Sequence, residues 1–364
     1  MKQTITEKIL ASAAGKKYVK PGEIIVIKVD GIIGHDITTA AFRSLERMGV
    51  DKVFDKDKIF FTVDHFLPSP TLDAAKQLKD LYYFIDKYQI SNFFEPGKGG
   101  ICHALFPEKG LIKPGMTVVG SDSHTCTYGA LGAFSTGLGA TEVAATMATG
   151  EIWLKVPETL KFVYSGIMNP CVTGKDLILY TIGQIGVDGA LYKAMEFTGV
   201  AIENLDMDNR FTICNMAVEA GAKNGIINPD SVTLEYLRDK CDLEDIKLYS
   251  SDLEAKYEKI YHMDVTSIEP VVAMPHSPHN IAFAKELNSV KVHQVVIGSC
   301  TNGRLSDLSA AADILKGKRV APGVRVLVVP ATQEIYLQAI EKGYIQTFIE
   351  AGAIITPPTC GACF

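Results

Sequence analysis

The sequence predicts an α/β protein with three domains, in which parallel-type sheets are joined by crossover helices. Three observations lead to this prediction. Apolar, β-branched runs alternate along the chain with segments whose apolar residues recur at helical spacing. Several polar motifs directly follow expected strands, where ligand sites of parallel sheets lie. The chain has 364 residues, 47% of them hydrophobic and 21% charged, which suits a globular protein of two or three domains.

A first domain is expected over residues 1–157. Thr4 and Glu7 have the spacing of a capping box, which predicts a short helix at the N-terminus. The GLGATE motif lacks the third glycine of a dinucleotide fingerprint, so nicotinamide binding is not expected. The further expected elements are two buried strands, Glu23–Val29 and Ile59–Val63, a third strand, Met116–Gly120, the helix Leu72–Tyr88, and a small-residue helix from about Thr141.

Two more domains are expected over residues 158–285 and 286–364. The second opens with a strand at Lys161 (KFVYSG), and its charged, aromatic segment Asp242–Met263 is expected to be peripheral helix and loop. The third repeats the α/β pattern. Its expected elements are the strands Val290–Gly298, Val324–Val329 and Ala353–Thr356 and the helices Asp307–Leu315 and Gln333–Ala351.

The charge balance argues against several classes of function. The formal net charge is −6, so the chain has no overall attraction for nucleic acid or for an anionic membrane. No run approaches the roughly 18 apolar residues of a membrane-spanning helix, and the N-terminus lacks the apolar core of a signal peptide. We therefore expect a cytoplasmic protein whose eight cysteines stay reduced.

Polar motifs follow four of the expected strands. The carboxyl ends of parallel strands meet at one edge of a sheet, so these motifs are expected to converge on one site. Taken singly, a motif of this kind is equally compatible with a turn or a helix cap. The motifs are Asp64-His65, Asp122-Ser123-His124, Cys300 and Cys360.

Other polar residues are candidates of the same kind. His103 in GICHALF is either a site residue or a buried core histidine. Asn215 and Glu219 are four residues apart on an expected helix, so they would share a face, either in a site or as a solvated stripe. His35 and Asp36 follow a VDGIIG turn and are either site residues or a helix cap.

The C-x-x-C pair of Cys360 and Cys363 raises three possibilities. A thioredoxin-like redox motif needs a following helix, which is not expected here. A zinc site needs a fourth ligand, and no histidine stands at a recognisable zinc spacing. Together with Cys300 the pair gives three thiolates, which on a four-iron cluster leave one iron open. Spacing alone leaves zinc and iron–sulfur equal. The remaining cysteines are expected to be ordinary thiols: Cys102, Cys126, Cys171, Cys214 and Cys241.

Six motifs, taken together, resemble those of the aconitase family in order and spacing. The similarity covers essentially the whole chain. The motifs are VDH (Val63–His65), GICH (Gly100–His103), GSDSHT (Gly120–Thr125), ICNMAVEAGA (Ile213–Ala222), IGSCTNGR (Ile297–Arg304) and CGAC (Cys360–Cys363). The resemblance implies an aconitase-like arrangement of three α/β domains around a central cluster site.

The resemblance also implies the chemistry. A [4Fe-4S] cluster held by Cys300, Cys360 and Cys363, with its fourth iron open to substrate, would serve a hydro-lyase that removes water from a hydroxy acid and adds it back. Length and the IGSCTNGR wording are most similar to large subunits that isomerise 2-isopropylmalate to 3-isopropylmalate in leucine biosynthesis. Large subunits that act on homoaconitate or on other alkylmalates, such as 2,3-dimethylmalate, are the alternative.

Residue roles follow from the motif match. Asp64 and His65 would protonate the departing hydroxyl, and His103 and Asp122 would form a supporting pair. His35 stands in H-D-I-T where the family carries Q-D-A-T, so its role differs from the family pattern. The implied catalytic residues are Asp64, His65, His103, Asp122, His124 and Glu219, and the implied substrate-binding residues are His35, Asp36, Ser123 and Asn215.

Two parts of the family pattern are missing. An arginine-bearing segment usually follows the last cysteine, so we expect the stop at Phe364 to be a truncation. The family's serine base lies on a swivelling domain, here expected on a small subunit in a heterodimer or heterotetramer. The isolated chain is therefore expected to be inactive and able to lack the cluster. Two remote alternatives are an RNA-binding regulator, which the acidic charge disfavours, and a zinc or redox protein.

Overall fold

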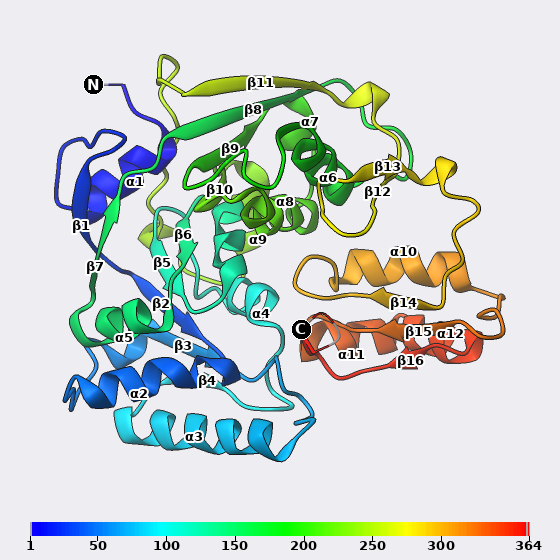
Figure 1. The fold of residues 1–364 in the computed structure, drawn as a ribbon, viewed down its shortest axis with the longest axis horizontal. Coiled ribbons are helices and arrows are strands. Elements are labelled where there is room, and N and C mark those ends of the chain that lie inside the picture. The colour runs from blue at the N-terminus through cyan, green and yellow to red at the C-terminus, as the bar shows by residue number, and fades with distance from the viewer. Residues whose placement is uncertain (1, 362, 364) are drawn as a thin grey trace. The chain divides into compact units, whose positions relative to one another are not determined.

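The computed structural model describes residues 2–361 and 363 (Figure 1). The chain forms two compact units. Unit 1 comprises Met1–Ile32 and Lys109–Asn288, and unit 2 comprises Ile33–Glu108 and Ser289–Phe364. This division differs from the three domains expected from the sequence, whose boundaries stay a prediction.

Unit 1 is built on a four-stranded parallel sheet. Its order is β10-β9-β8-β11, formed by β10 (Asn224–Ile227), β9 (Ala194–Thr198), β8 (Thr159–Ser165) and β11 (Lys259–Asp264). The helices of this unit are α1 (Ile5–Ala13), α5 (Ala140–Thr149), α6 (Gly174–Ile185), α7 (Val200–Glu203), α8 (Met207–Asn215) and α9 (Ser231–Leu237). The predicted capping box is confirmed, because Thr4 caps α1 and exchanges both hydrogen bonds with Glu7.

Two predictions for unit 1 are wrong. Strand β1 (Ile24–Lys28) pairs antiparallel with β7 (Glu151–Lys155) and alternates between exposed and buried residues, so it is not a buried strand. The Asp242–Met263 segment is not all peripheral helix and loop, since its last residues enter β11 and pair with β8. In both places pairing with a distant strand decides the structure, and a local pattern does not contain that information.

The part of unit 1 that carries the SDSH motif is a parallel pair of strands. They are β5 (Thr117–Gly120) and β6 (Phe134–Gly137), and the 3-10 helix η3 (Ser123–Leu131) connects them. Helix η3 packs on α8. The remaining short elements of this unit are η4 (Met216–Ala220), η5 (Leu243–Asp245), η6 (Val265–Ser267), η7 (Ala284–Glu286) and the antiparallel pair β12 (Val271–Ala273) and β13 (Ile281–Phe283).

The N-terminal part of unit 2 carries the predicted strand and helix. β3 (Ile59–Thr62) is fully buried and pairs in parallel with β4 (Asn92–Phe94), and β2 (Gly31–Gly34), at the unit boundary, lies on its other side. The helix predicted over Leu72–Tyr88 is confirmed as α3, capped by Thr71. The other helices here are η1 (Asp36–Thr38), α2 (Thr39–Arg47), η2 (Lys56–Lys58) and α4 (Cys102–Glu108).

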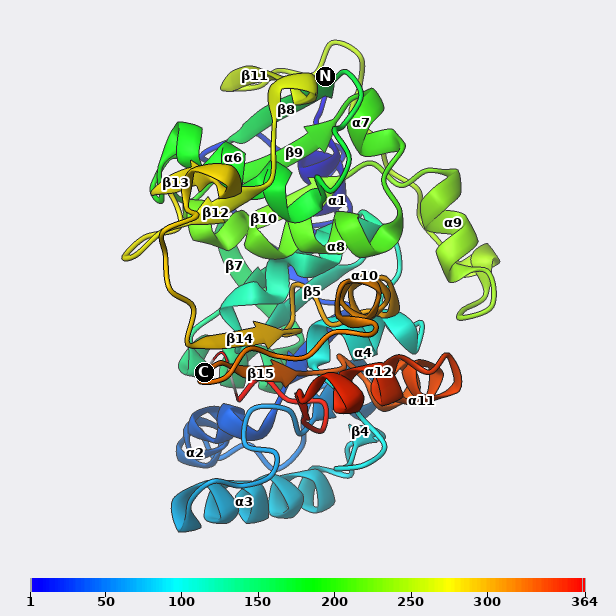
Figure 2. The same ribbon diagram turned by 90° about the vertical axis from the view of Figure 1, so that its right-hand side faces the viewer.

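The C-terminal part of unit 2 is a three-stranded parallel sheet with three helices, which Figure 2 shows grouped beside it. The strands are β14 (Gln294–Ile297), β15 (Arg325–Val328) and β16 (Ile354–Ile355), and the helices are α10 (Leu305–Leu315), α11 (Gln333–Glu341) and α12 (Tyr344–Ala351). The single helix expected over Gln333–Ala351 is wrong: the chain breaks it at Gly343, whose φ of 76° is left-handed.

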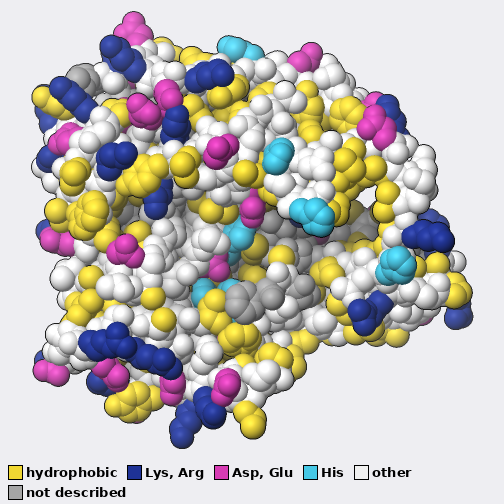
Figure 3. All heavy atoms as spheres, in the orientation of Figure 1, with side chains coloured by type: hydrophobic (Ala, Val, Ile, Leu, Met, Phe, Trp, Pro, Cys, Tyr) yellow, Lys and Arg dark blue, Asp and Glu magenta, His cyan; other side chains and the backbone are white. Residues whose placement is uncertain are grey.

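The two parts of unit 2 are tied together by backbone hydrogen bonds. The Ile101 N–H donates to the Ala331 carbonyl over 2.8 Å, and the Gln333 N–H donates to the Gly99 carbonyl over 3.1 Å. These bonds hold the GICH segment against the loop that follows β15. On the face shown in Figure 3, Lys and Arg side chains are interspersed with Asp and Glu. None of the helices in the described part of the chain has the length and apolar character that a membrane crossing requires.

Candidate active site

The turn after β3 in unit 2 holds a carboxylate–imidazole pair. Asp64 Oδ1 lies 2.7 Å from His65 Nδ1, and both side chains are buried. The second carboxylate oxygen of Asp64 accepts a hydrogen bond of 2.8 Å from the Cys102 N–H. Burial acts to raise the pKa of Asp64, but the charge of His65 and the hydrogen bond with it hold that pKa below its ordinary value. The pair therefore presents an ionised carboxylate that orients an imidazole.

Asp36 holds the backbone of this turn in place. Its carboxylate accepts hydrogen bonds from the backbone N–H groups of Asp64 (3.3 Å), His65 (3.0 Å) and Phe66 (2.6 Å). His35, next in the chain, lies with its ring centroid 4.2 Å from that of His65. Both His35 and Asp36 are fully buried, and the contacts of Asp36 define it as a positioning residue. Substrate contact by these two residues stays a prediction.

The same four side chains have the proximity of a metal-binding group. One ligand atom from each of His35, Asp36, Asp64 and His65 lies within 4.8 Å of the others. However, the carboxylates of Asp36 and Asp64 already accept hydrogen bonds from four backbone N–H groups and from His65. We therefore interpret this group as a hydrogen-bond network.

Two of the three predicted cluster cysteines meet in the interior of unit 2. Cys300 follows β14 and Cys360 follows β16, and both pack with Ile101 and Val329. Their exposed fractions are 7% and 9%. The hydrogen bond between the two thiols, together with burial, raises the pKa of Cys360 above its ordinary value. As the chain stands, this thiol is therefore neutral.

The loop that carries Cys360 is tied to the carboxylate–imidazole pair. The Cys360 N–H and the Thr359 hydroxyl both donate to the Asp64 carbonyl, over 2.6 and 2.9 Å. Cys363 is exposed and lies on the same turn, with its N–H donating to the Cys360 carbonyl over 2.9 Å. None of the eight cysteines forms a disulfide. Unit 2 therefore brings the three predicted ligands and the Asp64–His65 pair to one edge of its strands.

Unit 1 assembles a second polar group after β5. Asp122 caps η3 by accepting a hydrogen bond of 2.7 Å from the His124 N–H. The His124 ring lies between Ser123, with Oγ 3.2 Å from Nδ1, and Glu219, with Oε1 3.3 Å from Nε2. The hydrogen bond from His124 outweighs partial burial and lowers the pKa of Glu219. Three of the four side chains thus form a hydroxyl–imidazole–carboxylate relay.

Asn215 is in a different environment from Glu219. Helix α8 ends at Asn215 and η4 begins at Met216, so the expected single α-helix through both residues is wrong. Asn215 is fully buried, and its Nδ2 donates to the Thr127 hydroxyl over 2.8 Å. Asn215 and Glu219 differ in environment because the chain after Asn215 takes the tighter 3-10 geometry, in which residues four apart do not share a face.

Sequence reasoning missed a buried arginine next to the candidate thiols. Arg304 is 5% exposed, and its guanidinium donates to the carbonyls of Thr301 (2.9 Å) and His103 (3.5 Å). It therefore links the Cys300 loop to the GICH segment. The IGSCTNGR motif contains Arg304, but nothing in the sequence distinguishes it from an exposed helix-capping arginine. His103 itself is buried, and its predicted pairing with Asp122, a residue of the other unit, stays a prediction.

Fold and site together define an α/β protein with acid–base pairs and a set of three thiols beyond the ends of its strands. The profile described as "Aconitase family (aconitate hydratase)" matches residues 7–286 and 282–364. The chain belongs to the aconitase family, as its motifs predicted.

Full-length relatives bear a more specific name. A protein of Thermodesulfovibrio yellowstonii named "3-isopropylmalate dehydratase large subunit" is 56% identical over 364 residues, which are 100% of this chain and 86% of that protein. One of Moorella thermoacetica with the same name is 55% identical, with the same coverage. "3-isopropylmalate dehydratase large subunit 1" of Pyrococcus furiosus is 54% identical over 99% of this chain and 85% of that protein.

A solved structure supports the fold. The holo-form of Thermococcus kodakaraensis aconitase X matches with a TM-score of 0.53 and 14% identity, over 92% of this chain and 79% of that chain. At this identity the likeness concerns the fold alone. The predicted aconitase-like α/β fold class is confirmed.

Proposed function

We propose that this chain is the large subunit of a hydro-lyase that isomerises 2-isopropylmalate to 3-isopropylmalate in leucine biosynthesis, by removing water and adding it back. The observation that carries the reaction type is the 2.6 Å hydrogen bond that joins the Cys360 loop to Asp64, because it sets an acid–base pair beside the candidate thiols. The substrate is supported by the names of relatives that are 52–56% identical over nearly all of this chain.

The donor set fits the cluster that the aconitase family typically uses. Cys300, Cys360 and Cys363 would hold a [4Fe-4S] cluster, since two of the thiols already contact each other and the third lies on the same turn. When bound, the cluster supplies a Lewis acid that assists departure of hydroxide. Thiolates are the ligand form, so the Cys360 thiol would give up its proton in order to serve as a ligand.

Asp64 and His65 are suited to deliver the proton that leaving hydroxide needs. The Asp64 carboxylate accepts from Nδ1–H of His65 and stabilises the protonated ring, which leaves Nε2–H as the donor. Asp36 keeps the turn in place through its three backbone hydrogen bonds. The same pair accepts a proton when water is added back, because the reverse step uses the same groups.

The residues of unit 1 are assigned to binding and orientation. Glu219 and His124 share a hydrogen bond, so a bound hydroxyl or carboxylate of the substrate can exchange protons with the imidazole. Ser123, on the other side of the ring, holds its orientation and offers a hydroxyl to the substrate. Asn215 is buried behind these residues, and its side chain is held by the hydrogen bond to Thr127. We assign it a role in positioning them. His103 and Asp122 are assigned as a supporting pair.

A small subunit is the expected partner. The relatives are named large subunits, and none of the roles assigned above removes the proton from carbon. We assign that step to a base on a small subunit with the swivelling domain, in a heterodimer or heterotetramer. The isolated chain is therefore expected to be inactive.

The proposal is tested with the reconstituted enzyme. The chain is co-expressed with the small subunit of the same organism and loaded anaerobically with iron and sulfide. Formation of the unsaturated intermediate is followed by ultraviolet absorbance with 2-isopropylmalate, homocitrate and 2,3-dimethylmalate. The highest kcat/KM is expected with 2-isopropylmalate. Preference for another of these acids would overturn the substrate, and stoichiometric zinc without a brown chromophore would overturn the reaction type.

A further inference from the structure

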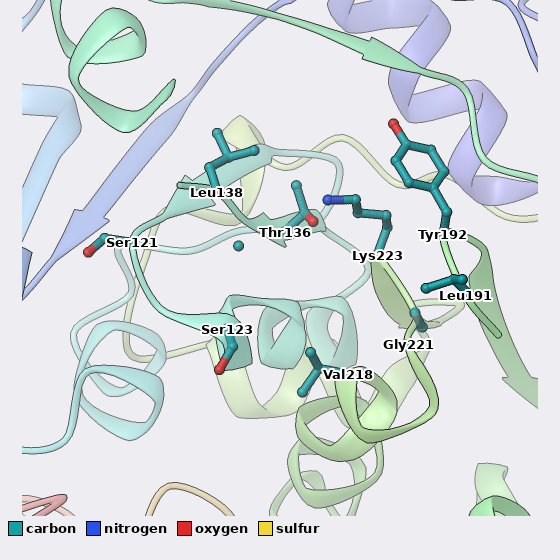
Figure 4. A pocket seen from close by; sticks show the side chains of 11 residues that line it. Ser121, Ser123, Thr136, Leu138, Leu191, Tyr192, Val218, Gly221 and Lys223 are labelled. Carbon is teal, nitrogen blue, oxygen red and sulfur yellow. The ribbon is translucent and has the colours of Figure 1, made fainter. Parts of the chain in front are cut away.

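Unit 1 contains a cavity to which no role has been assigned. Its volume is about 490 Å³, within the usual range of small-molecule pockets. Lys223 and Tyr192 lie on one side of it, Ser121 and Ser123 lie on the other, and Thr136 lies between them (Figure 4). All of the lining residues belong to unit 1. Ser123 connects the cavity to the polar group after β5, because its hydroxyl contacts His124.

Lys223 is held at the cavity by the loops on either side. Its N–H donates to the Lys193 carbonyl over 2.8 Å, and the Tyr192 N–H donates to the Gly221 carbonyl over 3.0 Å. The ammonium of Lys223 lies 5.2 Å from the centroid of the Tyr192 ring. Figure 4 shows the Lys223 side chain directed across the cavity toward Thr136.

A second ammonium lies on the same ring. Lys155 Nζ is 4.8 Å from the Tyr192 centroid, and the Lys155 N–H donates to the Tyr192 hydroxyl over 3.3 Å. Among residues 2–361 and 363, no carboxylate forms a salt bridge with Lys155 or Lys223. Glu142 lines the neighbouring cavity of about 170 Å³ together with both lysines and Tyr192, but it does not line the cavity of about 490 Å³. Lys223 therefore brings a positive charge to the larger cavity, where no carboxylate among the described residues is part of the lining, and this charge favours an anionic ligand.

The rest of the wall defines the ligand further. Leu138 and Val218 line the same cavity as Lys223, so an ammonium and hydroxyl groups face a space with an apolar side. A carboxylate suits the ammonium, a hydroxyl suits the side chains of Ser121 and Thr136, and an aliphatic group suits the two apolar residues. Few ligand classes combine all three features.

We propose that this cavity is a binding subsite for a small aliphatic hydroxy acid, with Lys223 as the ion-pair partner of its carboxylate. The apolar wall of Leu138 and Val218 receives the aliphatic group. The identity of that acid as an alkylmalate rests on the proposed function, whereas binding of a hydroxy acid at Lys223 does not. The ligand is either the substrate on its way to His124 or another hydroxy acid that acts at this subsite.

The test uses direct binding to the chain without a cluster. Trp153 is the only tryptophan, and it lines the neighbouring cavity together with Lys223 and Tyr192, so its fluorescence reports on the site. Wild type, Lys223→Met, Lys223→Arg and Lys155→Met are titrated with 2-isopropylmalate, malate and isobutyrate, and each Kd is checked by calorimetry. Lys155→Met is the matched control, because Lys155 contacts the same ring but does not line this cavity.

The expected result is selective loss at Lys223. Lys223→Met should weaken 2-isopropylmalate binding at least about tenfold, the effect of losing one charge-assisted bond. Lys223→Arg should keep most of the affinity, and Lys155→Met should change it about twofold or less. Tighter binding of 2-isopropylmalate than of malate identifies the substrate as the ligand, and equal binding identifies hydroxy acids in general. No binding by wild type, or equal Kd values for wild type and Lys223→Met, overturns the proposal. Neither result bears on turnover by the reconstituted enzyme.

Discussion

The carbonyl oxygen of Asp64 accepts a hydrogen bond of 2.6 Å from the backbone N–H of Cys360. The same carbonyl accepts a hydrogen bond from the Thr359 hydroxyl, and Thr359 lies 295 positions after Asp64 in the chain. One peptide group thus fixes the position of a candidate cluster thiol relative to a candidate proton donor. Side chains at both ends of this bond are buried. Small displacements of either loop should therefore affect both functions together.

The Asp64→Asn variant tests the acid–base pair. Asparagine keeps a carbonyl oxygen for the Cys102 N–H but loses the charge that stabilises protonated His65. The kcat of the reconstituted enzyme should fall about a hundredfold or more, with iron content unchanged. Asp73→Asn, at a highly exposed position, is the control and should keep full activity. An Asp64→Asn enzyme with normal kcat would remove this residue from the mechanism.

The Cys300→Ser variant tests the ligand set. A hydroxyl does not replace a thiolate on iron, so iron and sulfide bound per chain after anaerobic reconstitution should fall to a small fraction of the wild-type value. Cys171→Ser is the matched control, since Cys171 is exposed and distant in sequence from the three ligands. The readout is metal analysis together with visible absorbance. Equal iron content in the two variants would exclude Cys300 as a ligand.

The buried ion pair of Arg210 and Asp230 is expected to contribute to the stability of unit 1, and the Asp230→Asn variant tests this. Its guanidinium forms two 2.7 Å hydrogen bonds with the Asp230 carboxylate. Asp230→Asn retains an acceptor for the cap of α9 but leaves the buried arginine without a counter-charge, so the free energy of unfolding at pH 7 should fall by about 3 kcal/mol. Asp73→Asn should change it by less than about 0.5 kcal/mol. Denaturant titration measures both, and a loss equal to that of the control would contradict the argument.

The same pair predicts a pH dependence. Burial acts to raise the pKa of Asp230, but the hydrogen bonds and charge of Arg210, together with the backbone hydrogen bonds from Thr233 and Val232, outweigh burial and lower that pKa. The folded state therefore binds this proton less readily than the unfolded state. The stabilisation is complete above the ordinary carboxyl pKa of about 4 and is lost as pH falls through the lowered value. The difference between wild type and Asp230→Asn should accordingly shrink in acid, and an increase would reverse the sign of the argument.

Gly343 tests the break between α11 and α12. Its φ is 76°, and no atom lies within 4 Å of the position that a Cβ would occupy, so only backbone strain opposes a side chain. Gly343→Ala should destabilise the protein by about 1 kcal/mol, and Gly343→Asn by less, because asparagine tolerates the left-handed region. Denaturant unfolding of the two variants checks the order. Stabilisation by alanine would indicate a continuous helix.

The sequence by itself determined the elements whose signals are local. The Thr4–Glu7 capping box, the helix Leu72–Tyr88 and the buried strand Ile59–Thr62 need only neighbouring residues for their hydrogen bonds or periodicity. The polar motifs at the strand ends, and through them the aconitase family, were also predicted from the sequence, because a motif is defined by the type and order of neighbouring residues.

Only the tertiary structure decided which of these groups meet and what holds them. Asp36 under the Asp64–His65 turn, the buried Arg304, and Lys223 on the Tyr192 ring all depend on contacts between segments far apart in the chain. The exposed face of β1 depends likewise on its pairing with β7. Such contacts form when apolar surfaces pack, because buried polar groups must then find hydrogen-bond partners on segments far away in the chain. A local sequence pattern does not specify which distant residue that partner is.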